Sequence, residues 1–245
     1  MMISNRPLTA LLAVVVLAST LQAGTIVRVT VQGTVEYNQI SAGSLGQVNS
    51  GDAATMSFLL DSADFVNSAS FPTRGYVIDQ DSFGIAFPGG TMKLKSPYPA
   101  GTTPYFVLRD NDPAVDGFLV SDNVDLPVGV TLPQPGGIAP NFINNFYVTY
   151  GGSDLSSLDL LDAVGTYDYT GLSVFNWTID DGPFNPLGFI FETLTIEVEA
   201  PWVDLGGGTV GVNGQPTLET FGPLTAGSDT TIQLTAAAPS APMVV

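Results

Sequence analysis

The sequence predicts an all-β fold, an antiparallel β-sandwich of the jelly-roll or immunoglobulin-like type with one short helix. Two segments, Thr25–Tyr37 and Gly188–Ala200, carry this prediction because their apolar and polar residues alternate, as they do along a strand with one buried face. The composition agrees, since 27 Gly and 18 Pro supply turns and only 12% of the residues are charged. Several short strands separated by turns are typical of a sandwich.

The clearest strands define a predicted core. Thr25–Tyr37 places its valines on one face, and Ala53–Leu60 alternates in the same way, so we expect the two to pair as neighbours. In Gly188–Ala200 one face carries Ile190, Leu194, Ile196 and Val198, with Glu192 as the exception. We expect the following residues to be buried: Val29, Val31, Phe58, Ile85, Leu194 and Ile196.

Further elements are predicted between these strands. Asp61–Gly75 is predicted to be a polar connection, and Asp122–Asn141, with four Pro, a loop or an edge segment. Asp154–Val164 has leucines at helical spacing after Ser153 or Asp154 as a cap, and predicts the short helix. Short strands are expected at Gly75–Ile78, Ser82–Phe87, Thr91–Lys95, Tyr105–Arg109, Gly117–Ser121, Phe142–Tyr150 and Leu172–Ile179.

The first 23 residues have the organisation of a secretory signal peptide. Arg6 precedes the apolar run Leu8–Ala18, and a small, polar segment ends at Ala23, the expected cleavage residue. The run is too short to span a membrane, so we expect no membrane span in the mature chain. Cleavage removes Arg6 and no acid, which leaves 5 basic against 23 acidic residues, a net charge of −18. A secreted chain without Cys indicates a bacterial exported protein.

Composition also excludes several functions. The chain has no Cys and no His, which removes disulfides, thiolate and imidazole metal sites, Cys nucleophiles and Ser-His-Asp triads. Its acidic surface would repel phosphate backbones and anionic lipid, so nucleic acid is not an expected partner. Any enzyme built on this chain would depend on carboxylates, Lys, Tyr or oxygen-bound metals.

Asp110, Asp112 and Asp116 form the densest acidic segment and are the candidate metal ligands. Oxygen ligands at alternating positions suit Ca²⁺, which is the one candidate cofactor. The segment lacks the EF-hand pattern, since no bidentate Glu follows. The alternative is a loop whose Asp and Asn side chains cap turns and face water, and the frequency of Asp in turns favours this alternative.

Two further groups of residues have a chemical alternative. Trp177 and Trp202 are candidate carbohydrate-stacking residues, with Tyr147, Tyr150, Tyr167 and Tyr169 as further aromatics, although core packing is the commoner role. Three carboxylate pairs at strand ends are of the residue type that glycoside hydrolysis requires, but sequence cannot place any two across a cleft. These pairs are Asp61/Asp64, Asp79/Asp81 and Asp180/Asp181.

Two parts of the chain resemble known kinds of exported protein. Residues 24–200 resemble the exported β-sandwich domains of bacterial PEP-CTERM-type proteins, through Thr25–Tyr37, Ser57–Asp61, the FNWTIDD stretch at Phe175–Asp181, and Phe189–Val198. Residues 202–245, with WVDLGGGTVGVNGQPTL and GPLTAGSDTTIQLTAAAPSAPMVV, resemble the start of a planctomycete-type secreted C-terminal β module. The PEP-CTERM sorting tail itself is absent from this sequence, and neither family supplies catalytic residues.

The expected organisation is therefore a signal peptide at 1–23, a β-sandwich domain at 24–200, and a linker with a truncated C-terminal β module at 201–245. We expect a secreted or cell-surface protein without enzymatic activity, with a structural, adhesive or matrix-associated role. Extracellular polysaccharide and other surface proteins are the expected partners. The alternatives are a carbohydrate-binding module that uses surface aromatics and a carboxylate-dependent glycoside hydrolase.

Overall fold

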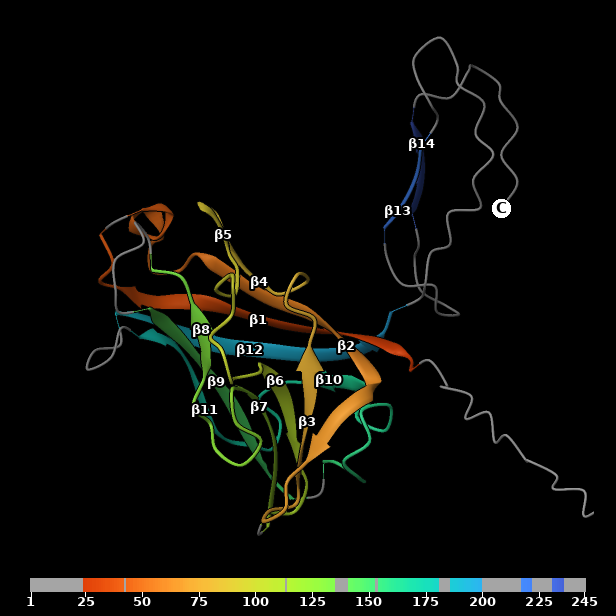
Figure 1. Ribbon diagram of the computed structural model, residues 1–245. Coiled ribbons are helices and arrows are strands. Elements are labelled where there is room, and N and C mark those ends of the chain that lie inside the picture. The colour runs from red at the N-terminus through yellow and green to blue at the C-terminus, as the bar shows by residue number, and fades with distance from the viewer. Residues whose placement is uncertain are drawn as a thin grey trace, which may run out of the picture.

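The computed structural model describes residues 24–41, 43–112, 114–134, 141–152, 154–180, 186–199, 217–221 and 231–235. The predicted signal peptide, the segment 201–216 that contains Trp202, and most of the C-terminal region lie outside these residues. Figure 1 shows β1, β2 and β12 crossing above a set of steeper strands that includes β3, β6, β7 and β9.

Eight strands form a closed antiparallel barrel. Their order is β1, β12, β11, β9, β7, β6, β3 and β2, and pairing of β2 with β1 closes the ring. The predicted sandwich is therefore wrong, while the prediction of an all-β fold is confirmed. The strands of the ring are β1 (Ile26–Asn38), β2 (Ala53–Asn67), β3 (Thr73–Ile78), β6 (Tyr105–Arg109), β7 (Val115–Ser121), β9 (Phe142–Gly151), β11 (Leu172–Asp180) and β12 (Leu187–Val198).

Four short strands extend this sheet outside the ring. β4 (Gly84–Phe87) pairs with β2 and with β5 (Gly90–Met92). β8 (Val130–Leu132) pairs with β9, and β10 (Gly165–Tyr167) pairs with β12. β13 (Thr217–Phe221) and β14 (Thr231–Thr235) form a separate two-stranded sheet in the region predicted to begin a second module.

β2 explains why the ring closes. Its first half pairs with β1 on one side and β4 on the other, and its second half pairs with β3. Between these halves, four residues of β2 oppose Val77 alone, since Leu60 faces Ile78 and Phe65 faces Tyr76. A bulge of this kind bends a strand and increases its twist, which lets one strand belong to two parts of a curved wall.

The predicted core is confirmed. Val29, Val31, Phe58, Ile85, Leu194 and Ile196 are each at most 1% exposed. Large side chains from every part of the wall meet inside the barrel, with the Phe106 and Phe118 rings stacked at 5.7 Å. The largest fully buried side chains are Trp177, Tyr76, Tyr150, Phe58, Phe83, Phe106, Phe118, Phe146 and Phe191. An eight-stranded barrel has an interior that side chains can just fill, and here they fill it.

β12 differs from prediction at its first half. Val198, which the alternation places on the buried face, is the last residue of β12 and is 42% exposed. In the first half of β12 the alternation places Ile190 on the buried face, but Ile190 is 40% exposed, and Phe189 and Phe191 are buried instead. The cause is a bulge at Glu192: Thr193 pairs with Gln32 and Phe191 pairs with Gly33, so Glu192 has no partner on β1. The extra residue moves the buried positions from one parity to the other.

Gly33 allows the close approach at this bulge. A Cβ on Gly33 would lie 2.3 Å from the Ile190 carbonyl oxygen and 2.9 Å from the Trp177 ring. Both distances are below van der Waals contact, so a larger residue would separate β1 from β12.

The predicted helix at Asp154–Val164 is wrong. Within the described residues the only helix is a single 3-10 turn, η1 (Ser44–Gln47), and residues 160–163 form turns. Ser157 Oγ accepts a hydrogen bond from Asp159 N, and Asp159 Oδ1 accepts one from Leu161 N. Such local side-chain bonds compete with helical hydrogen bonds. None of the helices in the part of the chain described is long and apolar enough for a membrane span.

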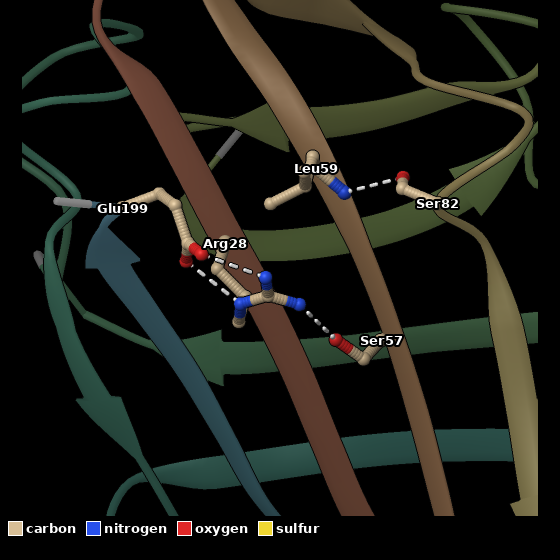
Figure 2. Close-up of polar contacts among 5 residues, drawn as sticks. All are labelled: Arg28, Ser57, Leu59, Ser82 and Glu199. Atoms are coloured by element: carbon tan, nitrogen blue, oxygen red, sulfur yellow. Dashed lines mark hydrogen bonds and ion pairs between the residues drawn. The ribbon is translucent and has the colours of Figure 1, made fainter. Parts of the chain in front are cut away.

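On the outer surface, Arg28 forms an ion pair with Glu199 and a hydrogen bond with Ser57, and so links three neighbouring segments of the barrel. Arg28 on β1 donates to both carboxylate oxygens of Glu199 at 2.8 Å and to Ser57 Oγ on β2 at 3.4 Å (Figure 2). The hydrogen bond to Glu199 is the main cause of a raised Arg28 pKa. On the far side of β2, the Leu59 backbone N–H donates to Ser82 Oγ at 2.8 Å. These contacts link Glu199, the residue after β12, to β1, and link β2 to the Ser82 turn.

Candidate functional site

The three predicted metal ligands have different environments. Asp116 on β7 is completely buried, and its carboxylate oxygens accept backbone hydrogen bonds from Asn111 at 2.8 Å and from Leu155 at 2.7 Å. Asp116 therefore ties the Asn111 turn and the Leu155 segment to one end of the barrel. This is an anchoring arrangement in which both carboxylate oxygens already have partners.

Asp110 and Asp112 lie on the same turn but use their side chains elsewhere. Asp110 Oδ1 accepts from the Asn111 side chain at 2.6 Å, and Asp112 Oδ2 lies 3.6 Å from Arg109 Nε. Asn111 has a φ of 52°, a left-handed conformation that Asn tolerates better than most residues. Across the described ranges, no group of three or more acidic side chains is arranged to hold a metal ion.

Trp177 lies in the barrel interior. It is 1% exposed and stacks on Phe189 with a centroid distance of 4.5 Å. Its indole N–H donates to Asn144 Oδ1 at 3.2 Å, which satisfies a buried polar pair inside the core. Stacking on a sugar requires an exposed ring face, and Trp177 has none in this structure. Trp202 lies outside the described residues.

The structure brings a different aromatic residue to the surface. Tyr169 is 50% exposed, and its ring lies 6.1 Å from Phe175 and 6.0 Å from Phe191, centroid to centroid. Phe175 and Phe191 are themselves 6.3 Å apart. We call these three residues the Tyr169 cluster. It presents one exposed ring on two partly or fully buried rings, which restrict its motion.

The topology of β12 creates this cluster. Leu187 and Gly188 pair with β11, and residues 194–196 pair with β10. Among the described residues, no strand pairs with the same side of the intervening segment Phe189–Thr193. The Tyr169 turn lies beside this edge, held by a 3.1 Å hydrogen bond from Tyr150 Oη to the Asp168 carbonyl oxygen.

The surroundings of Tyr169 are acidic. Burial raises the pKa of the Tyr169 hydroxyl, and the negative charge of Glu192 raises it further. Asp168, the residue before Tyr169, has a lowered pKa because its carboxylate accepts hydrogen bonds from Thr170. The hydroxyl therefore stays protonated near neutrality, and the cluster offers an apolar ring face, a hydroxyl donor and nearby carboxylates.

A second carboxylate with an altered pKa belongs to a different part of the barrel. Asp122 accepts a short hydrogen bond from the Tyr98 hydroxyl, and the same Tyr98 oxygen accepts from Thr131 N at 3.0 Å. Burial raises the pKa of Asp122, and the hydrogen bond from Tyr98 opposes that rise in part. These contacts fix the segment around Tyr98 to β8. We infer a structural role, since both partners are committed to each other.

The predicted carboxylate pairs are partly brought together. Asp61, Asp64 and Asp79 line one pocket of about 250 Å³, whose remaining walls are Ile26, Leu59, Leu60, Val77 and Ile78. Asp61 and Asp64 are close in sequence. Asp79 lies near them because β2 pairs with β3 across the bulge at residues 61–64, and no sequence pattern reveals this pairing. Asp81 is not among the lining residues. Pockets that bind drug-sized ligands are commonly larger, about 300–1,000 Å³.

Comparison with known proteins gives no assignment: no family model, curated protein or solved structure matches this chain.

Proposed function

We propose that this chain is an exported, non-enzymatic protein with a structural, adhesive or matrix-associated role at the cell surface, as expected from its sequence. The packed interior is the observation that carries the proposal. Barrels of eight strands either hold a small ligand or fill their interior with side chains. Here aromatic side chains fill it, so binding would use the outer surface and the barrel would act as a rigid support.

The roles of two altered or buried carboxylates support the same proposal. Asp116 anchors two backbone segments, and Asp122 is held by Tyr98. General acid–base chemistry needs a carboxyl group that can reach a substrate proton, and these two groups are engaged with the protein itself.

The test expresses the full chain, residues 1–245, in a bacterial host and collects the secreted protein, which is expected to consist of residues 24–245. We expect it to sediment with extracellular polysaccharide or with cell-wall material and to release no sugars from a polysaccharide panel. Sustained hydrolysis that disappears in an Asp61→Asn, Asp64→Asn or Asp79→Asn variant would contradict the proposal and favour the glycoside hydrolase. Recovery of the protein only from the cytoplasm would contradict the export part.

A second candidate is carbohydrate binding, which the exposed ring of Tyr169 favours. A tyrosine ring held from behind by Phe175 and Phe191 can stack on a sugar at little cost in side-chain entropy. Nearby Glu192 and Asp168 can accept hydrogen bonds from sugar hydroxyls.

A glycan array separates this candidate from a purely structural role. We expect binding by the parent protein to be lost in Tyr169→Ala and kept in Tyr147→Ala, a half-buried tyrosine on β9 that serves as the matched control. Equal loss in both variants, or no binding by the parent, would contradict a sugar site at the Tyr169 cluster.

A further inference from the structure

The expected start of the mature chain lies against β2. Thr25 N donates to Ser62 Oγ at 2.8 Å, and Ser62 N donates to the Thr25 carbonyl oxygen at 3.0 Å. The register of β1 and β2 ends with Ile26 opposite Asp61. These two bonds therefore continue the pairing of the barrel beyond Ile26, up to the expected cleavage point.

Gly24 itself contacts Asp61. A Cβ on Gly24 would lie 1.6 Å from Asp61 Oδ1 and 2.7 Å from Ala63 N, so only glycine fits this position without a shift. Standard bond lengths and angles separate a backbone nitrogen from its own Cβ by about 2.5 Å. The Gly24 nitrogen is therefore no more than about 4 Å from Asp61 Oδ1, from that separation and the 1.6 Å gap. This is the range of an ion pair.

The carboxylates around Gly24 lack an opposing charge within the described residues. Asp61, Asp64 and Asp79 line one pocket together with Ile26. The two ion pairs found in this part of the chain join Arg28 to Glu199 and Arg109 to Asp112, and involve none of the three. A cation placed at Gly24 would reduce the mutual repulsion of these carboxylates.

We propose, on the basis of the export proposed above, that removal of Met1–Ala23 creates this cation. Hydrolysis of the Ala23–Gly24 peptide bond consumes one water, leaves a carboxylate on Ala23 and frees an amine on Gly24, which takes up a proton near neutral pH. The α-ammonium group then pairs with the Asp61 carboxylate. In the precursor the same nitrogen is an uncharged amide, so processing completes the seam between β1 and β2.

The proposal fixes the direction of a pH dependence. Neighbouring carboxylates favour the charged form and raise the pKa of the Gly24 α-amino group above its ordinary value of about 7.7–8.0. A group whose pKa is raised by folding stabilises the folded state below its unfolded pKa, and this contribution is lost as pH rises through the folded pKa. The stabilisation is thus complete at neutral pH and disappears in the alkaline range.

The experiment prepares residues 24–245 in vitro by cleaving a fusion protein directly before Gly24, so that it does not depend on export. Thermal unfolding is compared for the free amine, for protein acetylated at Gly24, and for Asp61→Asn, which keeps an acceptor for Ala63 N. Glu36→Gln, an exposed charge near the other end of β1, is the matched control. We expect acetylation and Asp61→Asn each to lower Tm by about 2–4 °C, the usual scale for a modest interaction in a chain of this size.

Two further readouts distinguish an ion pair from general destabilisation. Acetylation of the Asp61→Asn variant should lower Tm no further, because the two changes remove the same interaction. The Tm advantage of the free amine should vanish as pH rises through the alkaline range. Additive losses, a pH-independent difference or an equal loss in Glu36→Gln would overturn the proposal. Retention of Met1 on exported protein would contradict cleavage after Ala23 and overturn the proposed role of processing, whereas recovery of the protein only from the cytoplasm would contradict export and leave the result on the cleaved protein intact.

Discussion

Replacement of Asp116 by Ala should produce a large loss of stability. The side chain is 0% exposed and accepts two backbone hydrogen bonds, at 2.8 Å from Asn111 and 2.7 Å from Leu155. Hydrogen bonds to a charged group contribute about 1.5–3 kcal/mol each. The Leu155 N–H is buried and would stay unpaired, whereas the exposed Asn111 turn can recover a water partner. We therefore expect a loss of about 3–4 kcal/mol, the lower part of the summed range.

The matched control is Asp112→Ala on the same turn. Its carboxylate lies 3.6 Å from Arg109 Nε and both side chains are partly exposed, so the change should cost less than about 1 kcal/mol. Urea unfolding at pH 7 measures both variants, with an unchanged m value as the sign that only stability has changed. A loss below about 1 kcal/mol for Asp116→Ala, or equal losses in the two variants, would refute the anchoring role. Repeating the titration with Ca²⁺ tests the calcium prediction, because binding at Asp110, Asp112 and Asp116 would stabilise the parent and not Asp116→Ala.

Three other perturbations follow from the same contacts. Leu194→Ala removes a side chain that is 0% exposed and should cost about 2–5 kcal/mol in urea unfolding; a cost under about 0.5 kcal/mol would place Leu194 at the surface. Glu199→Gln should lower stability by about 0.5–1 kcal/mol at low salt and by less at high salt, because the pair with Arg28 is about one-third exposed, and a salt-independent effect would argue against the ion pair. Asp122→Asn should equal or exceed the parent in stability at pH 7. The raised pKa of Asp122 means that folding favours its protonated form. The stability that protonated Asp122 contributes to the parent is lost as pH rises from about 4, the ordinary pKa, through the raised value. An Asp122→Asn variant that is less stable than the parent at pH 7, and that gains stability relative to the parent on acidification, would contradict a raised pKa of Asp122.

Strands with one buried face were predictable from sequence. β1 extends from Ile26 to Asn38 against a predicted Thr25–Tyr37, and its pairing with β2 is confirmed. Their alternation is visible because each buries every second side chain in the core. The same reasoning identified the six core residues from Val29 to Ile196.

The barrel was not predictable in this way. Its closure depends on the second half of β2, from Asp61 to Asn67, where the residues are exposed or half-buried. A strand that buries neither face has no period-two pattern, so the sequence predicts only a polar connection over Asp61–Gly75. Without that segment, only Leu60 of β2 would pair with β3, and the remaining strands are compatible with two separate sheets.

Single-residue irregularities account for the other differences. Glu192 interrupts an otherwise regular pattern because it is the bulged residue itself, and the parity on either side of it differs. In Asp154–Val164 the leucine spacing suggests a helix, but the side chains of Ser157 and Asp159 bind backbone N–H groups of this segment, and such local bonds compete with helical hydrogen bonds.

The candidate site was predictable only in part. Tyr169 is one of six candidate aromatics, and no local pattern sets it apart, because its exposure results from the place where β11 and β10 each leave β12. Asp61, Asp64 and Asp79 are recognisable as acidic residues at strand ends, while their shared pocket depends on the pairing of β2 with β3. Residue types identify candidates, and the register between distant strands decides which of them meet.

The packed interior of the barrel is tested most directly by the fluorescence of Trp177 in a Trp202→Phe variant, which leaves Trp177 as the single tryptophan. A ring that is 1% exposed and enclosed by Phe146 and Phe189 should emit at short wavelength. It should also resist quenching by acrylamide and remain unchanged when sugars or apolar ligands are added. Emission at the wavelength of a hydrated indole, ready quenching, or a ligand-dependent shift would show an accessible interior and would contradict an outer-surface function.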